Sequence, residues 1–169
     1  MSTPHVVVVM GVAGTGKTTI GLLLAVALGV PYAEGDDFHP PANIAKMTAG
    51  NALDDDDRHP WLESIGEWLA ERSEAGGVMS CSALKRKYRD QLRQHEPRTE
   101  FLLLHGTFEV ITRRQASRPG HFMPASLLQS QFDTLEPLAP DENGVVVDVD
   151  QSIDAIVTEY ASTLPEERA

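Results

Sequence analysis

Cysteine is almost absent from this chain, because Cys81 is the single one among 169 residues. A single cysteine excludes a disulfide within the chain, favours a reducing compartment, and is predicted to be a small core residue rather than a nucleophile. No apolar run approaches the roughly 20 residues that a membrane-spanning helix needs. The run Met1-Ser2-Thr3-Pro4-His5 leads directly into an apolar segment and leaves no room for a secretory signal. We therefore expect a cytoplasmic protein.

Basic residues are also scarce: 14 Lys and Arg stand against 25 Asp and Glu, and the formal net charge is −11. Nucleic acids and anionic membranes bind to basic faces, so both are excluded as expected partners. The hydrophobic share of 41% is ordinary for a globular protein, and the length suits one domain with a real core. With no linker and no internal repeat in the pattern, we predict a single domain over residues 1–169.

Short apolar runs alternate with helical patterns along the chain, which indicates βαβ units on a parallel sheet. The predicted strands are 6–10, 31–33, 78–81, 101–104 and 145–149. The predicted helices are 17–28, 61–74, 85–94, 108–116, 126–135 and 152–164. This order predicts an α/β fold of three layers around a five-stranded parallel sheet.

Two regions do not fit plain connections between these elements. Residues 35–60 form a long polar segment rich in Pro, Asp and Asn, and residues 117–124 combine Arg, Gly, His and Pro. Long irregular segments in a compact domain are usually functional or disordered. In a phosphoryl-transfer enzyme they would be a cover for the acceptor site, at about residues 35–75, and a lid, at about 117–125.

Residues 11–18 form a complete phosphate-binding loop between an apolar strand and a helix. The glycines let backbone N–H groups surround the β- and γ-phosphates, and the helix adds the positive end of its dipole. Lys17 is expected to reach the phosphate oxygens and Thr18 to ligate Mg²⁺. A plain glycine-rich turn accounts for the glycines but not for Lys followed by Thr. The nucleoside triphosphate is therefore predicted to contact Gly11, Val12, Ala13, Gly14, Thr15, Gly16, Lys17 and Thr18.

Acidic residues follow the second predicted strand, at the edge where ligands bind in open α/β sheets. Asp36 would accept a proton from an attacking hydroxyl or orient it toward the γ-phosphate. Glu34, two residues earlier on an extended chain, would face the same side, beside the metal or its waters. The same acids would also serve as an N-cap and turn before a helix near Asn43. The local pattern leaves both interpretations open.

A run of four acids at residues 54–57 is typical of a solvated helix start, where carboxylates complement the helix dipole. Arg58 follows this run directly, and its guanidinium has the geometry to bind a carboxylate with two parallel hydrogen bonds. Trp61 and Trp68 are seven residues apart on one helical face, and both are predicted to be core residues.

The third predicted strand leads into small residues and then into a basic cluster, which is unusual in so acidic a chain. A helix starting near Ser82 would offer free N–H groups to an anion. Arg86 and Lys87 fit an exposed helix face paired with acids better than Lys85 or Arg89 do.

A second pair of basic residues, Arg114 and Arg118, ends the predicted helix 108–116 and enters the following loop. Four residues apart, both can project to one side, one over an adenine and the other over the transferring phosphoryl group. They would also complement the dipole at a helix C-terminus. The Pro-Gly sequence in the adjoining loop favours the lid interpretation.

Five blocks of the sequence together resemble the gluconate kinases (gluconokinases) of the short phosphate-loop type, which are related to shikimate and adenylate kinases. The blocks are 11–18; Gly35-Asp36 with His39-Pro40, Asn43 and Lys46-Met47; 53–62; 81–85 with Tyr88-Arg89-Asp90; and 118–124 with Leu127-Leu128 and Ser130-Gln131-Phe132. They span nearly the whole chain in order. Many nucleotide-binding proteins share the first block, whereas the middle blocks are specific to this family. Glu34 stands where the family pattern has Asp, which preserves the charge.

The resemblance implies a P-loop NTPase fold like that of the nucleoside-monophosphate kinases, and transfer of the ATP γ-phosphoryl group to the 6-hydroxyl of D-gluconate with Mg²⁺. It also implies a homodimer. The implied catalytic residues are Lys17, Asp36 and Arg118, with Thr18 on the metal and Arg114 and Arg118 on the nucleotide. The implied acceptor-binding residues are Asp36, His39, Arg58, Ser82, Ala83, Leu84 and Lys85. An anionic acceptor also explains why basic groups occur at these positions of an acidic chain.

Three other functions are compared with this one. A shikimate or nucleotide kinase would share the fold and lid, but the acceptor blocks favour gluconate. A GTPase switch should carry an Asn-Lys-x-Asp segment, and the sequence has none. A mechanical ATPase should place an Asp for Mg²⁺ after an apolar strand, whereas the third strand ends in Ser80-Cys81-Ser82. Residues 145–148 have that shape, but their place near the C-terminus predicts the last strand, with its loop beside the adenine.

Overall fold

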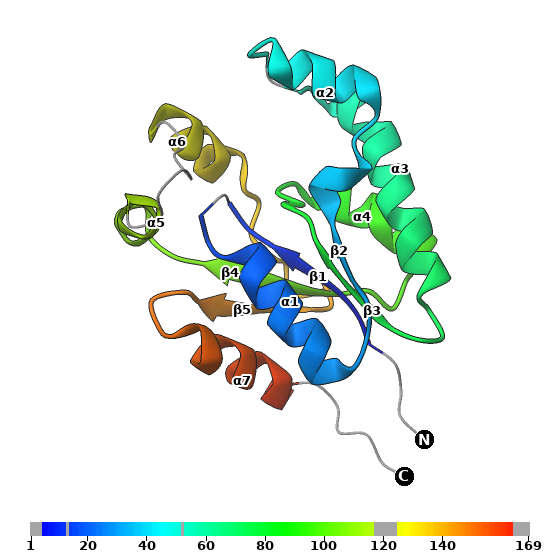
Figure 1. Ribbon diagram of the computed structural model, residues 1–169, viewed down its shortest axis with the longest axis vertical. Helices are drawn as coiled ribbons and strands as arrows, with labels where there is room; N and C mark the ends of the chain where they lie inside the picture. Colours follow the sequence, from blue (N-terminus) through cyan, green and yellow to red (C-terminus); the bar gives the residue numbers. More distant parts are fainter. Residues whose placement is uncertain (1–4, 13, 52, 117–124, 164–169) are drawn as a thin grey trace.

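A computed structural model describes residues 5–12, 14–51, 53–116 and 125–163. In this part of the chain, five parallel strands lie in the order β2-β3-β1-β4-β5 (Figure 1). The strands are β1 (Val6–Met10), β2 (Tyr32–Glu34), β3 (Gly77–Ser80), β4 (Glu100–His105) and β5 (Gly144–Asp148). The predicted α/β class and the five-stranded parallel sheet are confirmed.

Helices cover both faces of this sheet. They are α1 (Lys17–Leu28), α2 (Pro41–Thr48), α3 (Asp55–Glu71), α4 (Arg86–His95), α5 (Phe108–Ala116), α6 (Ala125–Thr134) and α7 (Ile153–Thr163), with a short 3₁₀ helix η1 (Gly35–Phe38). None of the helices in the described ranges combines the length and apolar character needed to cross a membrane.

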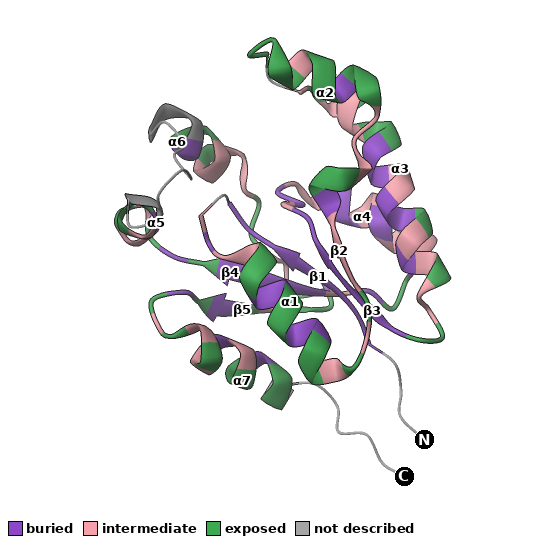
Figure 2. Cartoon of the chain, viewed as in Figure 1, coloured by how far each residue is buried: buried purple, intermediate pink, exposed green. Residues whose placement is uncertain are grey.

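The central strand β1 divides the core into two apolar clusters, as its alternating side chains require. Val7 and Val9 belong to a cluster with buried residues of α1 and α7, whereas Val6, Val8 and Met10 pack with buried residues of α3 and α4. Every residue of β1 is buried, as expected for a strand with helices on both sides (Figure 2). The three-layer prediction is confirmed.

The segment predicted to be irregular, 35–60, differs from that expectation. It contains η1, α2 and the first turn of α3, and Pro41 occupies the first turn of α2, where its missing N–H costs nothing. Helix α3 begins at Asp55 rather than at residue 61. The side chain of Asp54 accepts a hydrogen bond from the Asp57 N–H at 2.8 Å, and the Asp57 carboxylate accepts one from the Asp54 N–H at 2.9 Å. This capping box explains why the acidic run starts the helix.

Gly21 brings α1 close to the neighbouring strands. A β-carbon at this position would lie 2.6 Å from Cε1 of Tyr32 and 3.0 Å from the hydroxyl oxygen of Ser80. The space allows the Tyr32 ring to lie against the helix, where its hydroxyl is 2.9 Å from Glu34 and 2.7 Å from Ser80. A helical glycine usually costs about 1 kcal/mol relative to alanine. Here the glycine is required by the packing of Tyr32.

We expect Gly21→Ala to lower the free energy of unfolding by about 1–3 kcal/mol, the usual cost of overpacking, although alanine is the better helix former. Urea denaturation followed by circular dichroism measures the change. Thr19→Ala, at an exposed position of the same helix, is the control and should change stability by no more than about 0.5 kcal/mol. An unchanged or raised stability of Gly21→Ala would contradict the packing argument.

Candidate active site

The phosphate-binding loop connects β1 to α1 at the carboxyl end of the sheet. Gly11, Gly14 and Gly16 have backbone φ values of 141°, 84° and 88°, which residues with a side chain rarely adopt. A β-carbon on Gly11 would lie 2.6 Å from the carbonyl oxygen of Leu104 in β4. Gly16 precedes α1 and provides no side-chain cap for the first N–H groups of that helix. The loop therefore has the backbone of an anion-binding helix N-terminus.

Lys17 lies folded over this loop. Its ammonium group donates hydrogen bonds to the carbonyl oxygens of Gly11, at 2.9 Å, and Val12, at 3.0 Å. Burial lowers the pKa of Lys17, while the nearby Asp36, Cys81 thiol and Glu34 oppose that shift. The two predicted carboxylates and the loop lysine therefore lie close enough to interact electrostatically.

Thr18 and Glu34 are joined directly. The Thr18 hydroxyl donates to Oε2 of Glu34 at 2.7 Å, and the Tyr32 hydroxyl lies 2.9 Å from the same oxygen. Burial is the main reason why the pKa of Tyr32 is raised to about 12, so this phenol is neutral at physiological pH. Sequence reasoning placed Glu34 near the metal site but did not identify Tyr32.

These oxygen atoms fit Mg²⁺, which prefers hydroxyl and carboxylate oxygens and usually retains phosphate or water ligands. Among the described residues, no group of three or more His, Cys, Asp or Glu side chains is arranged to hold a metal ion. Thr18, with Glu34 beside it, would therefore hold Mg²⁺ only together with the phosphates of a nucleotide.

Asp36 lies in η1 and not on an extended chain, so the reason given for its alignment with Glu34 is wrong. Strand β2 ends at Glu34, and the chain then turns tightly over β3. A β-carbon on Gly35 would lie 2.4 Å from the carbonyl oxygen of Ser80, so only glycine fits this turn. Asp36 is exposed and acts electrostatically on both Lys17 and His39. Its predicted position near the phosphate loop is therefore consistent with the structure, although the local geometry differs.

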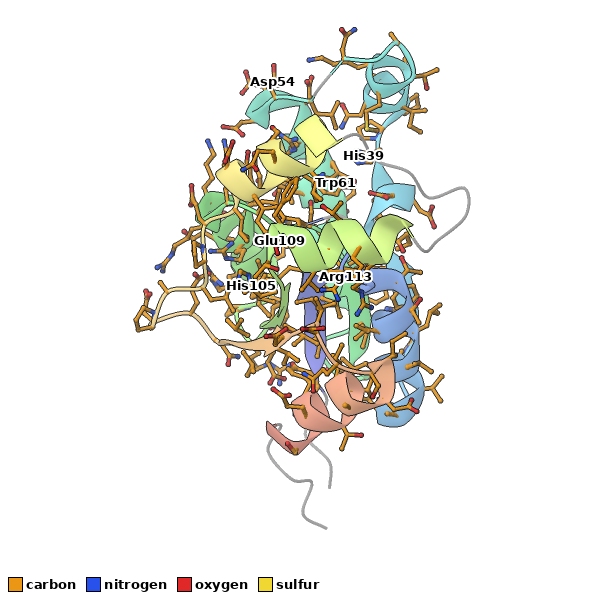
Figure 3. All side chains as sticks on the ribbon, turned by 90° about the vertical axis from the view of Figure 1, so that its left-hand side faces the viewer. His39, Asp54, Trp61, His105, Glu109 and Arg113 are labelled. Atoms are coloured by element: carbon orange, nitrogen blue, oxygen red, sulfur yellow. The ribbon has the colours of Figure 1, made fainter. Side chains whose placement is uncertain are left out.

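His39 and Trp61 form a stacked pair beside Asp36. Their ring centroids are 4.4 Å apart with an interplanar angle of 11°, and Figure 3 shows the two labelled side chains together. The Trp61 indole donates to the carbonyl oxygen of Gly35 at 2.7 Å. Burial lowers the pKa of His39, Asp36 raises it, and Arg58 lowers it further. Trp61 is thus a core residue, as predicted, but it also supports the turn that carries Asp36.

A second cluster joins α3 to α4 and to the turn before α4. Its members are Asp55, Arg58, Lys85, Lys87 and Tyr88. Arg58 donates to the Tyr88 hydroxyl at 3.3 Å, and its guanidinium lies 5.7 Å from the centroid of the Tyr88 ring. The Asp55 carboxylate accepts hydrogen bonds from Lys87, Tyr88 and Lys85, and the Lys85 ammonium is 3.2 Å away. These bonds, that from Lys87 first, hold the pKa of Asp55 well below its usual range. The prediction of a merely solvated acidic run is wrong for Asp55, because contacts with α4 cannot be read from local sequence.

The turn at residues 82–85 is irregular, and the expected helix near Ser82 is wrong. Helix α4 begins at Arg86, and Ala83 adopts a φ of 44°, which interrupts helical geometry before it. The carbonyl oxygen of Ser82 accepts a hydrogen bond from the Gly11 N–H at 3.3 Å. This bond fixes the turn beside the phosphate loop. The buried Cys81 precedes the turn, and burial raises the pKa of its thiol to about 12, in agreement with its prediction as a core residue.

Arg114 lies on the opposite side of the phosphate loop. It donates to the carbonyl oxygen of Val149 at 2.7 Å, and a β-carbon on Gly16 would lie 3.6 Å from its guanidinium. A hollow beside it is lined by Val110, Arg113, Arg114, Val149, Asp150 and Gln151. Its walls are α5, on which Figure 3 labels Arg113, and the loop after β5. Ala13, Arg118 and the predicted lid lie outside the described residues.

The parallel sheet, the phosphate loop and the adjoining carboxylates define a kinase of the P-loop class. A family model described as shikimate kinase matches residues 13–165. Gluconokinase of Gluconobacter oxydans (strain 621H) is 47% identical over 158 residues, which cover 92% of this chain and 89% of that protein. The crystal structure of a gluconokinase from Sinorhizobium meliloti 1021 superposes with a TM-score of 0.88 at 50% identity, over 96% of this chain and 92% of that one.

The chain belongs to the gluconokinase family, and the resemblance of its five sequence blocks is thereby confirmed. Shikimate kinase from Aquifex aeolicus vf5 superposes with a TM-score of 0.61 at 14% identity, over 93% of this chain and 94% of that one. That likeness concerns the fold alone.

Proposed function

We propose that this protein transfers the γ-phosphoryl group of ATP to the 6-hydroxyl of D-gluconate and produces 6-phospho-D-gluconate. The observation that carries the acceptor assignment is the cluster of Lys85, Lys87 and Tyr88, which already donates hydrogen bonds to a carboxylate, that of Asp55, with Arg58 bonded to Tyr88 beside it. A strongly acidic chain has little reason to concentrate donors for a carboxylate next to a phosphate loop unless its acceptor is an acid. The names of its relatives identify that acid as gluconate.

On the nucleotide side, the loop at residues 11–18 would surround the phosphates, and Lys17 would exchange its two carbonyl partners for β- and γ-phosphate oxygens. Arg114 and the hollow beside Val149 would take the adenine. Thr18 would hold Mg²⁺ with Glu34 beside it, and the ion, when bound, neutralises charge that develops on the phosphate oxygens. Arg118 would close over the γ-phosphate as part of a lid at about residues 117–125.

On the acceptor side, Asp36 would orient the 6-hydroxyl and receive its proton while the hydroxyl oxygen bonds to the γ-phosphorus. The bond from that phosphorus to the oxygen of the departing ADP breaks in the same transfer. His39, Arg58 and the turn at residues 82–85 would hold the sugar acid, with residues 35–75 as its cover. The stacking of His39 on Trp61 would fix one wall of this site.

Two further assignments accompany the activity. A kinase that consumes ATP and carries one cysteine suits the cytoplasm.

The homodimer implied by the family resemblance stays a prediction, for which the exposed apolar side chains of α1 offer a surface. They are Leu22, Leu23 and Val26, with exposed fractions of 47%, 41% and 79%.

The acceptor assignment predicts that gluconate supports ATP consumption far above the rate without acceptor, whereas shikimate and AMP do not. A coupled assay of ADP formation with each compound measures this. Equal activity with shikimate or AMP would overturn the gluconate assignment and leave only the P-loop kinase class.

The position of Asp36 predicts that Asp36→Asn lowers kcat by roughly 10²–10⁴-fold, the usual range for a positioned acid–base group. The lower end is expected because a loose phosphoryl-transfer transition state needs little help from a base. Asp37→Asn, an exposed neighbour in η1, is the matched control and should retain near-normal kcat. If Asp36→Asn behaves like this control, Asp36 only forms the turn.

Substitutions of Arg58 and of Arg118 are expected to change different kinetic constants. Arg58→Ala should raise the KM for gluconate roughly 10- to 100-fold, because a hydrogen bond to a charged group contributes about 1.5–3 kcal/mol to ground and transition states alike. Arg118→Ala should lower kcat and kcat/KM together, by about 10³–10⁵-fold.

Steady-state kinetics of both variants, with folding checked by circular dichroism, separate these effects. Arg58→Lys should recover only part of the gluconate affinity, because an ammonium cannot make two parallel hydrogen bonds. The KM for ATP should stay nearly constant in both Arg58 variants. A normal gluconate KM in Arg58→Ala, or a change of KM alone in Arg118→Ala, would contradict the division of roles.

A further inference from the structure

Arg89 is a fully buried cation with no assigned role in the proposed reaction. It lies on α4, its exposed fraction is 0%, and its guanidinium makes hydrogen bonds in two directions. On one side, Nε and Nη2 donate to the two carboxylate oxygens of Glu142 at 2.7 and 3.0 Å, and Nη2 also reaches the carbonyl oxygen of Pro137 at 3.4 Å. On the other side, Nη1 donates to the carbonyl oxygens of Ala83, at 2.9 Å, and Leu84, at 3.3 Å.

The ion pair with Glu142 makes this burial possible, since a buried charge is costly unless it is paired and fully hydrogen-bonded. Burial opposes ionisation of Glu142, but the bonds from Arg89, from the Ala139 N–H and from Arg93 lower its pKa to about 2. Glu142 is thus ionised at physiological pH. Glu142 anchors Arg89, and the two N–H donors of Nη1 are left to hold the turn.

The turn at residues 82–85 has its carbonyl oxygens occupied. Ser82 accepts from an N–H of the phosphate loop, Ala83 accepts from Arg89, and Leu84 accepts from both Arg89 and the Glu136 N–H, the latter at 2.7 Å. Polar acceptors of the turn are therefore directed into the protein and are satisfied there.

The N–H groups of the same turn are different. That of Ala83 is directed at the Cys81 sulfur, and those of Ser82, Leu84 and Lys85 make no hydrogen bond to any residue in the described ranges. Ala83 itself holds a φ of 44°, a conformation that costs about 1–2 kcal/mol for a residue with a β-carbon. The carbonyl oxygens of this strained turn are thus hydrogen-bonded, whereas three of its N–H groups are available as donors. Such a turn is suited to bind negatively charged oxygen atoms.

We propose that Arg89 is a positioning residue of the acceptor site. By holding the carbonyl oxygens of Ala83 and Leu84, it keeps the turn in the strained conformation that leaves the N–H groups of Ser82, Leu84 and Lys85 for the carboxylate or hydroxyl oxygens of a polyhydroxy acid. Arg89 does not touch this ligand. The inference rests on the proposed function, because it concerns how the gluconate site is shaped.

Arg89→Lys tests the proposal because it retains the charge and most of the chain length but cannot bond to Glu142 and to the two carbonyl oxygens together. We expect the KM for gluconate to rise at least tenfold while the KM for ATP changes less than twofold. Calorimetric titration with gluconate should show the same loss of affinity without turnover. A merely structural role would lower the melting temperature and the active fraction, and hence the apparent kcat, but would leave the gluconate KM unchanged.

Arg93→Lys is the matched control. Arg93 lies on the same helix and donates to the same Glu142 carboxylate at 3.0 Å, yet it contacts Asp90, Glu142 and Phe101 rather than the turn. Its gluconate KM should stay within twofold of the original value. If Arg93→Lys raises the gluconate KM as strongly as Arg89→Lys, the effect does not depend on hydrogen bonds to the turn, and the proposal is overturned.

Glu142→Gln provides a second test should Arg89→Lys fail to fold. It removes the anchoring charge but retains the shape, so Arg89 loosens and the gluconate KM should rise severalfold; an unchanged KM would overturn the proposal. The unsubstituted protein separates this proposal from the proposed function. Absence of gluconate turnover there would contradict the function itself, whereas normal turnover together with a normal gluconate KM in Arg89→Lys would contradict only the role of Arg89.

Discussion

The structure depends on one close backbone approach at Gly11. A side chain there would strike the carbonyl oxygen of Leu104, and the same residue donates its N–H to Ser82. The end of β4, the phosphate loop and the turn after β3 therefore meet at one residue. Because parallel strands present their carboxyl ends at one edge, this contact sets the distance between the groups that would hold a nucleotide and those that would hold an acceptor. Both halves of the site are positioned by backbone rather than by long side chains.

Basic side chains near this contact are paired with carboxylates of the same chain. The chain carries a net charge of −11, yet basic groups gather on the acceptor side. Two of them are held by internal carboxylates: Lys85 by the half-exposed Asp55, and Arg89 by the buried Glu142. These carboxylates reduce repulsion among neighbouring cations and keep them ordered in the absence of a ligand. The half-exposed pair of Asp55 and Lys85 is open to exchange with solvent and anions, whereas the buried pair of Arg89 and Glu142 is a fixed part of the framework.

The two acids at the end of β2 have separate surroundings. Glu34 is joined to Thr18 and Tyr32, and it therefore belongs to the region of the phosphates. Asp36 lies beyond the tight turn at Gly35 and interacts with His39, on the acceptor side. Gly35, which allows the chain to pass over β3, thus separates a carboxylate beside Thr18 from one beside His39; in the proposed reaction these would be the metal side and the acceptor side. That separation suits a reaction in which one group supports charge on phosphate and the other handles a hydroxyl proton.

The sequence by itself determined the α/β class, the five strands, the phosphate loop and the family, because strand periodicity and loop motifs are local patterns. The helix predicted to start near Ser82 is wrong, because the φ of Ala83 interrupts helical geometry there. The irregular segment predicted for residues 35–60 is also wrong, because the segment contains α2 and the Asp54 capping box starts α3 within it. Only the tertiary structure decided which groups meet: the stacking of His39 on Trp61, and the pairing of Arg89 with a carboxylate 53 residues away. The physical reason is that such contacts depend on how strands and helices pack, and no spacing along the chain encodes them.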